Sequence, residues 1–451
     1  MYQSRSDMRS ALVEIKNYRD VLPNGLTLIT IEMPHIHTLE ITMLIRAGLR
    51  FENEVNNGIS HFLEHMIFRG NKKYSDSVSL SMEFEKIGRD VRASTMTEYT
   101  FYGFSPHVSQ LERGMELFAD FFRDPTFPSI ELEREIILEE YLEEINGEGK
   151  NIDINNHACK LLYKGTSLAM PIVGTEKNIR TISSQMLREY FDEYYNPGNM
   201  VLVGAGCITH EDFLSLAQRN FGTLTTHGKV VAKKYFHGRI TENQKEPQVL
   251  CQYDSDSQVQ LQICFRAFSY NDPDFYKLSM INTIFDGGVT SRLQRALRED
   301  RGLVYSVECR TTTLSDIGTF DFDVVVSPEK VFLVTQILFK EIQSLLENGP
   351  TEEELEHVKK RYTYDLEFDL DDPYKQIVRY GFAELYSQQI SVEEERAIVE
   401  SITREDVLAI ARRLFVRNNL NIIIVGPSTP ELQKDLESFA RNFKSYGSNG
   451  N

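Results

Sequence analysis

The sequence predicts an α+β fold: two homologous domains in tandem, each a sandwich of one β-sheet and its helices. Three observations support this prediction: the length, a mixture of strand-like and helix-like periodicity, and an internal repeat. At about 100–200 residues per domain, a chain of 451 residues has room for two or three domains. Hydrophobic residues make up 41% of the chain, so each domain can bury a core.

The internal repeat keeps a constant offset between two segments of the chain. ISSQMLREYFDEYYNPGNMVLVGAGCITHEDF begins at Ile182, and ITREDVLAIARRLFVRNNLNIIIVGPSTPEL begins at Ile402 (402 − 182 = 220). Each segment reads as a helix, a short loop, a buried strand and a second helix. ITMLIRAGLRF resembles VQLQICFRAFSY, and Arg46 falls on Arg266 at the same offset. Several matches in the same order favour two homologous domains over chance.

Periodicity predicts the elements of the first half. Segments 26–32 and 38–46 alternate as strands do, and the Pro23-Asn24-Gly25 turn comes before them. Amphipathic spacing predicts helices at 57–70, 78–88, 108–123, 130–146 and 184–195.

Composition places the boundary between the two domains. The polar stretch 225–247 is the expected linker. The sequence therefore predicts an N-terminal domain at 1–224 and a C-terminal domain at 248–451.

Composition and charge also exclude several classes of function. A net charge of −18 repels phosphate backbones, so nucleic acid is not an expected partner. The sequence contains no run of about 18 apolar residues, so no membrane span is expected. The first residues lack the apolar stretch of a secretory signal. The five cysteines form no CxxC pair, which favours free thiols in a reducing compartment and makes cysteine-bound zinc unexpected. The cytoplasm is the default location that follows from the absence of signals, and an organelle stays open.

His61-Phe62-Leu63-Glu64-His65 is the motif that indicates chemistry. On a helix, at about 100° per residue, the two histidines share one face and can chelate one metal ion. Glu64 lies beside them and can take a proton from an attacking water. The alternative is a surface helix that carries two histidines and a glutamate by chance. The apolar neighbours argue against it, because imidazoles on a buried helix need partners.

The helix predicted at 130–146 is the source of a third ligand. Glu140 interrupts its apolar stripe at the centre and is the best candidate, and Glu133 two turns earlier could orient a histidine. The alternative is a solvated acidic face, which is the favoured reading of Glu139, Glu143 and Glu148.

These motifs resemble a known family. HFLEHMIFRGNKKYS, with EREIILEE downstream, is similar to the inverzincin metallopeptidases that include pitrilysin, insulin-degrading enzyme and mitochondrial processing peptidase. The resemblance implies one zinc ion per chain, held by His61, His65 and Glu140, with Glu64 as the catalytic base. The spacing between His65 and Glu140 (140 − 65 − 1 = 74) agrees with the family pattern. Glu133 matches the auxiliary acidic position of the family.

The resemblance extends to substrate contacts. SRLQRALREDRGLVYSV is similar to the family's substrate-binding segment, which implies that Arg298 and Tyr305 hold the substrate carbonyl. DVRASTMTEYTFYGFSP is similar to the strand that borders the cleft, and Ala93, Ser94 and Thr95 are the expected backbone contacts. The family usually has Asn where this chain has Arg92, so the subsite preference is open.

The second half lacks the metal motif. Leu278, Ile281 and Asn282 stand where the first half has His61, Glu64 and His65, at one offset (278 − 61 = 217). Thr363 stands where the first half has Glu140, at a similar offset (363 − 140 = 223). One catalytic domain and one substrate-holding domain are therefore expected.

The expected activity is that of a zinc endopeptidase for short or unfolded peptides. The family encloses a chamber with four such domains, which implies a homodimer of this chain or a heterodimer with a degenerate family member. The alternative from another class is a non-catalytic subunit that binds peptides or scaffolds an assembly. Removal of a leader from a precursor and general peptide degradation both stay open.

Overall fold

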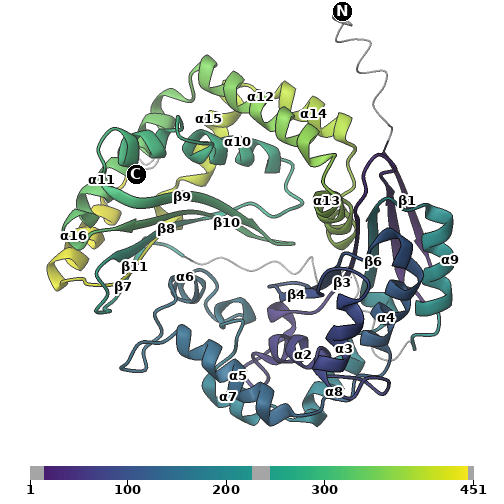
Figure 1. The fold of residues 1–451 in the computed structure, drawn as a ribbon. Helices are drawn as coiled ribbons and strands as arrows, with labels where there is room; N and C mark the ends of the chain where they lie inside the picture. The colour runs from purple at the N-terminus through teal and green to yellow at the C-terminus, as the bar shows by residue number, and fades with distance from the viewer. Residues whose placement is uncertain (1–14, 226–243, 445–451) are drawn as a thin grey trace, which may run out of the picture. The chain divides into compact units, whose positions relative to one another are not determined.

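The computed structural model describes residues 15–225 and 244–444, and within them the chain forms two compact units (Figure 1). Of the described residues, the first unit comprises 15–141, 171–225 and 366–389, and the second comprises 142–170, 244–365 and 390–444. The predicted linker at 225–247 falls mainly outside the described residues.

A six-stranded sheet forms the centre of the first unit. Its strand order is β1-β2-β6-β3-β5-β4, in which β2 and β6 are parallel and the other pairs are antiparallel. The strands are β1 (Lys16–Val21), β2 (Thr27–Glu32), β3 (Leu39–Ile45), β4 (Arg92–Thr95), β5 (Thr100–Phe104) and β6 (Met200–Gly206). β3 and β6 are buried at every residue, which means that both faces of the central strands are covered.

A five-stranded sheet of the same design forms the centre of the second unit. Its order is β7-β11-β8-β10-β9, again with one parallel pair, β7 with β11. The strands are β7 (Gln248–Gln252), β8 (Val259–Ala267), β9 (Val304–Thr313), β10 (Gly318–Val326) and β11 (Leu420–Val425). Gly206 after β6 and Gly426 after β11 have φ angles of 130° and 136°. The predicted duplication is therefore confirmed in topology and in backbone detail.

Helices surround both sheets. In the order of the chain they are α2 (Ile59–Ile67), α3 (Ser77–Glu85), α4 (Leu111–Arg123), α5 (Ile130–Glu143), α6 (Ile154–Leu162), α7 (Glu176–Thr181), α8 (Ser184–Tyr194) and α9 (His210–Phe221). They continue with α10 (Phe275–Asp286), α11 (Val331–Asn348), α12 (Glu352–Asp369), α13 (Pro373–Tyr386), α14 (Val392–Ser401), α15 (Arg404–Leu414) and α16 (Pro430–Arg441). The five helices predicted in the first half are all present, each with ends within three residues of the prediction.

The compact units are not the contiguous segments that the sequence predicted, because each half gives one helix to the other unit. α13, from the C-terminal half, packs on β3 and β6 of the first unit, and α6, from the N-terminal half, packs on β8 and β11 of the second (Figure 1). Amphipathic spacing shows that a helix buries one face but not which sheet it covers. The prediction of contiguous domains is wrong in these two places.

The repeated arginines hold the exchanged helices. Arg46, buried after β3, donates from Nη2 to the backbone oxygen of Glu384 in α13 at 3.2 Å. Arg266, the equivalent residue at the end of β8, donates to the backbone oxygen of Leu162, the last residue of α6. Cationic donors suit these positions because the last carbonyls of a helix have no partner within the helix.

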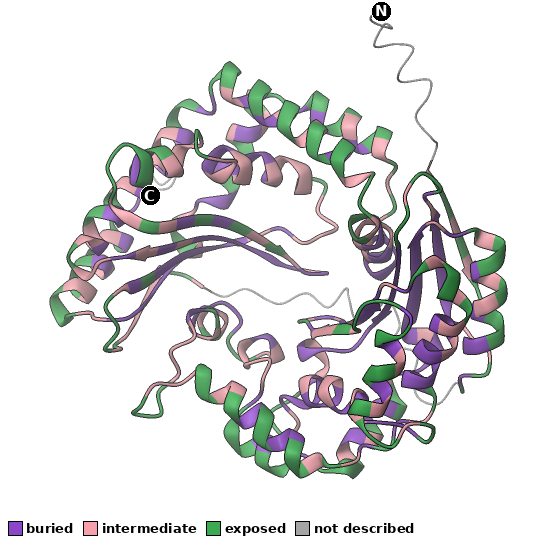
Figure 2. Cartoon of the chain, in the orientation of Figure 1, coloured by how far each residue is buried: buried purple, intermediate pink, exposed green. Residues whose placement is uncertain are grey.

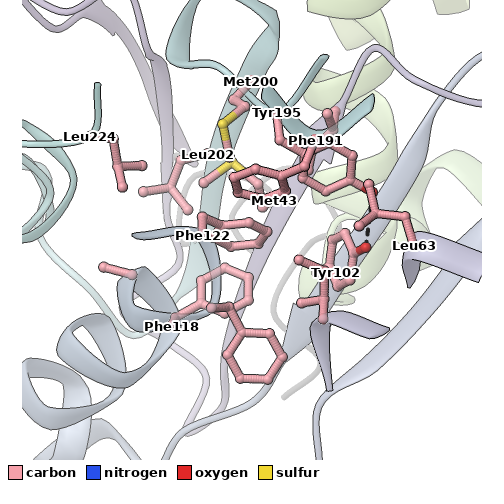
Figure 3. Close-up of a cluster of buried hydrophobic side chains, with 14 of the residues drawn as sticks. Met43, Leu63, Tyr102, Phe118, Phe122, Phe191, Tyr195, Met200, Leu202 and Leu224 are labelled. Atoms are coloured by element: carbon pink, nitrogen blue, oxygen red, sulfur yellow. Dashed lines mark hydrogen bonds between the residues drawn. The ribbon is translucent and has the colours of Figure 1, made fainter. Parts of the chain in front are cut away.

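The hydrophobic core of the first unit is rich in aromatic side chains (Figure 3). Tyr102, Phe118 and Phe122 are almost fully buried and pack edge to face. The hydroxyl groups of Tyr102 and Tyr195 lie 2.9 Å apart, so the polar atoms of two buried rings satisfy each other (Figure 3). Figure 2 shows that the central strands of each sheet are mainly buried, whereas the edge strand β9 and most helices also carry exposed residues.

The architecture confirms the predicted fold class of two homologous α+β domains. In the described part of the chain, no helix is long and apolar enough to cross a membrane.

Replacement of Gly206 by Ala should destabilise the first unit. An added Cβ would lie 2.2 Å from the backbone oxygen of Thr38, and a φ of 130° disfavours any residue with a Cβ. We expect a loss of at least about 2 kcal/mol in the free energy of unfolding, measured from the urea midpoint of the affected transition. The control is Gly147→Ala, where an added Cβ meets nothing within 4 Å. Equal midpoints for both variants would contradict this account.

Candidate metal centre

A buried carboxylate from outside the helix caps the start of α2. Glu52 accepts hydrogen bonds from the backbone nitrogens of Gly58 and Ser60 at 2.8 and 2.9 Å, which satisfies donors that the helix leaves free. Gly58 and Gly174 meet back to back, since a Cβ on Gly58 would lie 2.8 Å from the Cα of Gly174. The loop before α7 is thereby pressed against the start of α2, which fixes the helix in place.

The two faces of α2 have different environments. Phe62, Leu63 and Met66 are fully buried in the core of the first unit. His61, Glu64 and His65 are only partly buried. The predicted helix is thus confirmed, with the apolar side packed and the motif side accessible.

The structure brings His61, His65 and Glu140 together. The Nε2 atoms of the two histidines are 3.2 Å apart. The carboxylate of Glu140 on α5 places one oxygen 3.5 Å from His61 Nε2 and the other 3.6 Å from His65 Nε2. Within the described residues, these three form the one group of metal-ligating side chains whose donor atoms converge.

These distances fit a tetrahedral zinc ion. With zinc–nitrogen bonds of about 2.0–2.1 Å, two ligands of a tetrahedral ion are about 3.4 Å apart. The observed spacings of 3.2, 3.5 and 3.6 Å lie close to that value. Three protein ligands leave the fourth position open, as in catalytic rather than structural zinc sites.

Glu133 sets the orientation of His65. Its Oε1 lies 2.8 Å from Nδ1 of His65, and its other oxygen accepts from Arg69. Burial alone would raise the pKa of Glu133, but the hydrogen bonds from His65 and Arg69 lower it overall. An ionised Glu133 holds the proton of His65 on Nδ1, so the lone pair of Nε2 faces His61 and Glu140. This lone pair is suited to a metal ion shared with His61 and Glu140.

His61 is kept neutral by its surroundings. Burial, together with the charge of His65, lowers the pKa of His61 to about 3. Neutral imidazole is the form that binds metal ions.

Glu64 contacts the edge strand through Thr95. The Thr95 hydroxyl donates to Oε2 of Glu64 at 2.7 Å. Burial raises the pKa of Glu64, while the hydrogen bond from Thr95 opposes the rise. A carboxylate with a raised pKa is a stronger base than an exposed glutamate and suits proton transfer near neutral pH.

The predicted substrate contacts Ala93, Ser94 and Thr95 lie on β4, at the edge of the sheet. None of the described strands pairs with the free side of β4. Thr95 is buried, and its side chain positions Glu64, a role that the sequence did not reveal. Backbone contacts with substrate at this edge stay a prediction.

Arg298 and Tyr305 belong to the second unit, where both side chains are solvent-exposed. Arg298 follows α10 in a short helical segment, and Tyr305 lies near the start of β9. Their role toward the substrate stays a prediction.

At the positions of α10 that match the motif of α2, the described second unit carries no metal-ligating side chains. Leu278 and Ile281 on α10 are fully buried in its apolar core. Asn282 accepts a hydrogen bond from Thr311 at 3.3 Å.

Sequence reasoning assigned no role to Glu52 or Arg69. Arg69 follows His65 by one helical turn, a spacing that could have indicated a partner for a carboxylate near His65. No local signal marks Glu52, because its partners lie in the next helix.

Replacement of Glu133 by Gln should weaken zinc binding by about 10–100-fold. An amide cannot accept from both His65 and Arg69 with two oxygens, so the orientation of the imidazole is lost. Competition with a fluorescent zinc chelator measures the affinity. Glu139→Gln, an exposed change on the same helix, should have no effect. An unchanged affinity in Glu133→Gln would contradict the assigned role.

Zinc affinity should fall as the pH is lowered through the pKa of His65. In the metal-free protein, burial lowers this pKa, but the hydrogen bond to Glu133 and the charge of Glu140 raise it overall. His61, with a pKa of about 3, needs no deprotonation. Below the pKa of His65, log Kd should therefore rise by about one for each pH unit lost, and above it should level off. A slope near two in the titration would show that both imidazoles bind protons.

Comparisons with known proteins match both halves of this chain to one family. The family profile described as Insulinase (Peptidase family M16) matches residues 27–176, and that of the Peptidase M16 inactive domain matches 181–362. A zinc protease of Rickettsia felis, named as uncharacterized, is 28% identical over 419 residues, 90% of this chain and 97% of its own. The beta subunit of the mitochondrial-processing peptidase of Pongo abelii is 28% identical over 405 residues, 87% of this chain and 81% of its own.

Solved structures share the fold. A protease from Helicobacter pylori has a TM-score of 0.83 at 17% identity, covering 92% of this chain and 100% of its own. A peptidase M16 inactive domain from Pseudomonas fluorescens has a TM-score of 0.82 at 20% identity, covering 92% and 99%. With two M16 profiles in the expected order and relatives named zinc proteases along nearly its whole length, this chain belongs to peptidase family M16.

Proposed function

We propose that this protein is a zinc-dependent endopeptidase that hydrolyses short or unfolded peptides. The observation that carries the proposal is the convergence of His61, His65 and Glu140 with Glu64 beside them. Relatives named zinc proteases support the peptidase activity.

His61, His65 and Glu140 would hold one zinc ion per chain. When bound, zinc would polarise the scissile carbonyl and acidify the attacking water. Glu64 accepts a proton from that water on its carboxylate and delivers it to the nitrogen of the leaving amine. Thr95 holds Glu64 in place through its hydroxyl, at 2.7 Å. Arg298 and Tyr305 hold the substrate, and their N–H and O–H groups are suited to a developing oxyanion.

Extended peptides are the substrate class that this site suits. The free edge of β4 can pair with a peptide backbone through its own N–H and C=O groups, largely independently of sequence. Folded proteins cannot offer such a segment without local unfolding. Processing of a precursor and degradation of peptides both use this mode of binding.

Two copies of this chain are the economical assembly, because one chain carries both the zinc ligands and the Arg298 and Tyr305 pair. One relative is named as the beta subunit of a processing peptidase, which makes a heterodimer the alternative arrangement. Native mass spectrometry at concentrations where the protein is active distinguishes them.

Replacement of Glu64 by Gln should abolish peptide hydrolysis while zinc is retained. The amide cannot accept the proton, so we expect kcat to fall by at least about a hundredfold. The assay is cleavage of a mixed library of unstructured peptides by zinc-loaded wild type and variant, with zinc content measured by atomic absorption. Glu139→Gln serves as the matched control. If neither wild type nor variant cuts but both bind peptides, the protein is a binding subunit; if both cut equally, Glu64 is not the base.

A further inference from the structure

The segment that carries Arg298 has an unusual helical geometry. Residues Gln294–Glu299 form a π-helical turn, in which the backbone nitrogen of Asp300 donates to the oxygen of Arg295 at 3.0 Å. Turns of this kind are rare and occur frequently at functional sites. The side chain of Arg298 is 56% exposed and makes a loose ion pair, at 4.0 Å, with its neighbour Glu299. Little packing therefore holds its guanidinium, and the backbone determines the direction in which the side chain leaves the helical segment.

Tyr305 lies at a second irregularity, a bulge in β9. Val325 of β10 pairs with Ser306, whereas the next residue of β10 pairs with Val304, so Tyr305 is the extra residue. A bulge redirects the side chain at that position and is common beside active sites. Tyr305 is 80% exposed, so the direction of its side chain too depends on the backbone.

Two side chains connect these irregularities, and we name them the Gln294–Asp286 bracket. The amide nitrogen of Gln294, the first residue of the π turn, donates to Oδ1 of Asp286 at 3.0 Å and to the oxygen of Val307 at 2.8 Å. Oδ2 of Asp286, the last residue of α10, accepts from the backbone nitrogen of Cys309 at 2.9 Å. The bracket thus joins the end of α10, the start of the π turn and the strand just after the bulge.

The bracket replaces a missing neighbour strand. β9 is an edge strand, and in the described structure no strand pairs with its outer side. The oxygen of Val307 and the nitrogen of Cys309 are the two groups that an antiparallel neighbour would bond on that side. Because the bracket supplies one donor and one acceptor there, it fixes the register of β9 directly after Tyr305.

We propose that Gln294 and Asp286 are positioning residues that set Arg298 and Tyr305 at a fixed spacing for one substrate carbonyl. The inference rests on the proposed function, since it concerns the two side chains that hold the substrate there. Without the bracket, the π turn can relax to an α turn and rotate Arg298. The bulge can then slip by one residue, which turns Tyr305 to the other face of the sheet.

The first test compares Gln294→Met, which keeps length but loses both donors, with Gln343→Met as control. Gln343 lies on α11 and bonds to Glu347 on the same helix. The zinc-loaded full chain is assayed for kcat and KM with a quenched fluorescent peptide. We expect kcat/KM of Gln294→Met to fall about ten- to hundredfold, with unchanged zinc content, and the control to match wild type.

A double-mutant cycle separates positioning from a general structural role. In a background of Arg298→Ala with Tyr305→Phe, the loss caused by Gln294→Met should shrink to about twofold or less, because the groups it positions are gone. An undiminished loss in that background would overturn the proposal. So would wild-type kcat/KM in Gln294→Met alone.

A rescue variant guards against simple unfolding. Gln294→Glu places two carboxylates together and should lower kcat/KM at least as much as Gln294→Met. Adding Asp286→Asn restores one donor–acceptor pair and should recover part of the activity. No recovery by this second change counts against the bracket. If wild type neither cuts nor binds peptides, the proposed function fails and the bracket with it; if wild type cuts and the variants match it, the bracket alone fails.

Discussion

The candidate metal centre depends on one contact, the hydrogen bonds that Glu133 makes to His65 and Arg69. Two of the three zinc donors lie on α2, but the third lies on α5, far along the chain from the first two. Glu133 is on α5, and both of its partners are on or directly after α2. A buried carboxylate that lost these partners would be costly, so the two helices are held at the distance that Glu140 requires.

The exchange of helices is the constraint on the fold as a whole. Central strands that are apolar on both faces need a second covering layer, and α13 and α6 provide it from the opposite halves of the sequence. Gly381 of α13 lets that helix approach closely, since a Cβ there would lie 2.6 Å from Leu44. Neither half of the sequence can therefore complete its unit alone.

The two units share a scaffold but differ in the residues that are suited to chemistry. Apart from the additional edge strand β1 of the first unit, the two sheets share strand order and the parallel pair. Both units also have a buried arginine that binds a backbone carbonyl in the last turn of the exchanged helix. α10 carries Leu278 and Ile281 where α2 carries His61 and Glu64, and its apolar residues fill the core. The second unit instead has a π turn at Arg298 and a bulge at Tyr305 in β9. The hairpin β4–β5, which is the counterpart of β9–β10 in the first unit, pairs without a bulge.

The sequence by itself determined whatever follows from short-range spacing. The HxxEH motif puts His61 and His65 on one helical face whatever surrounds them, and the repeat at constant offset established two domains of one design. Only the tertiary structure decided which sheet α6 and α13 cover, that Arg69 shares Glu133, and that the Thr95 hydroxyl reaches Glu64. Periodicity indicates which face of a helix or strand is buried. Packing between segments far apart in the chain determines which side chains come into contact.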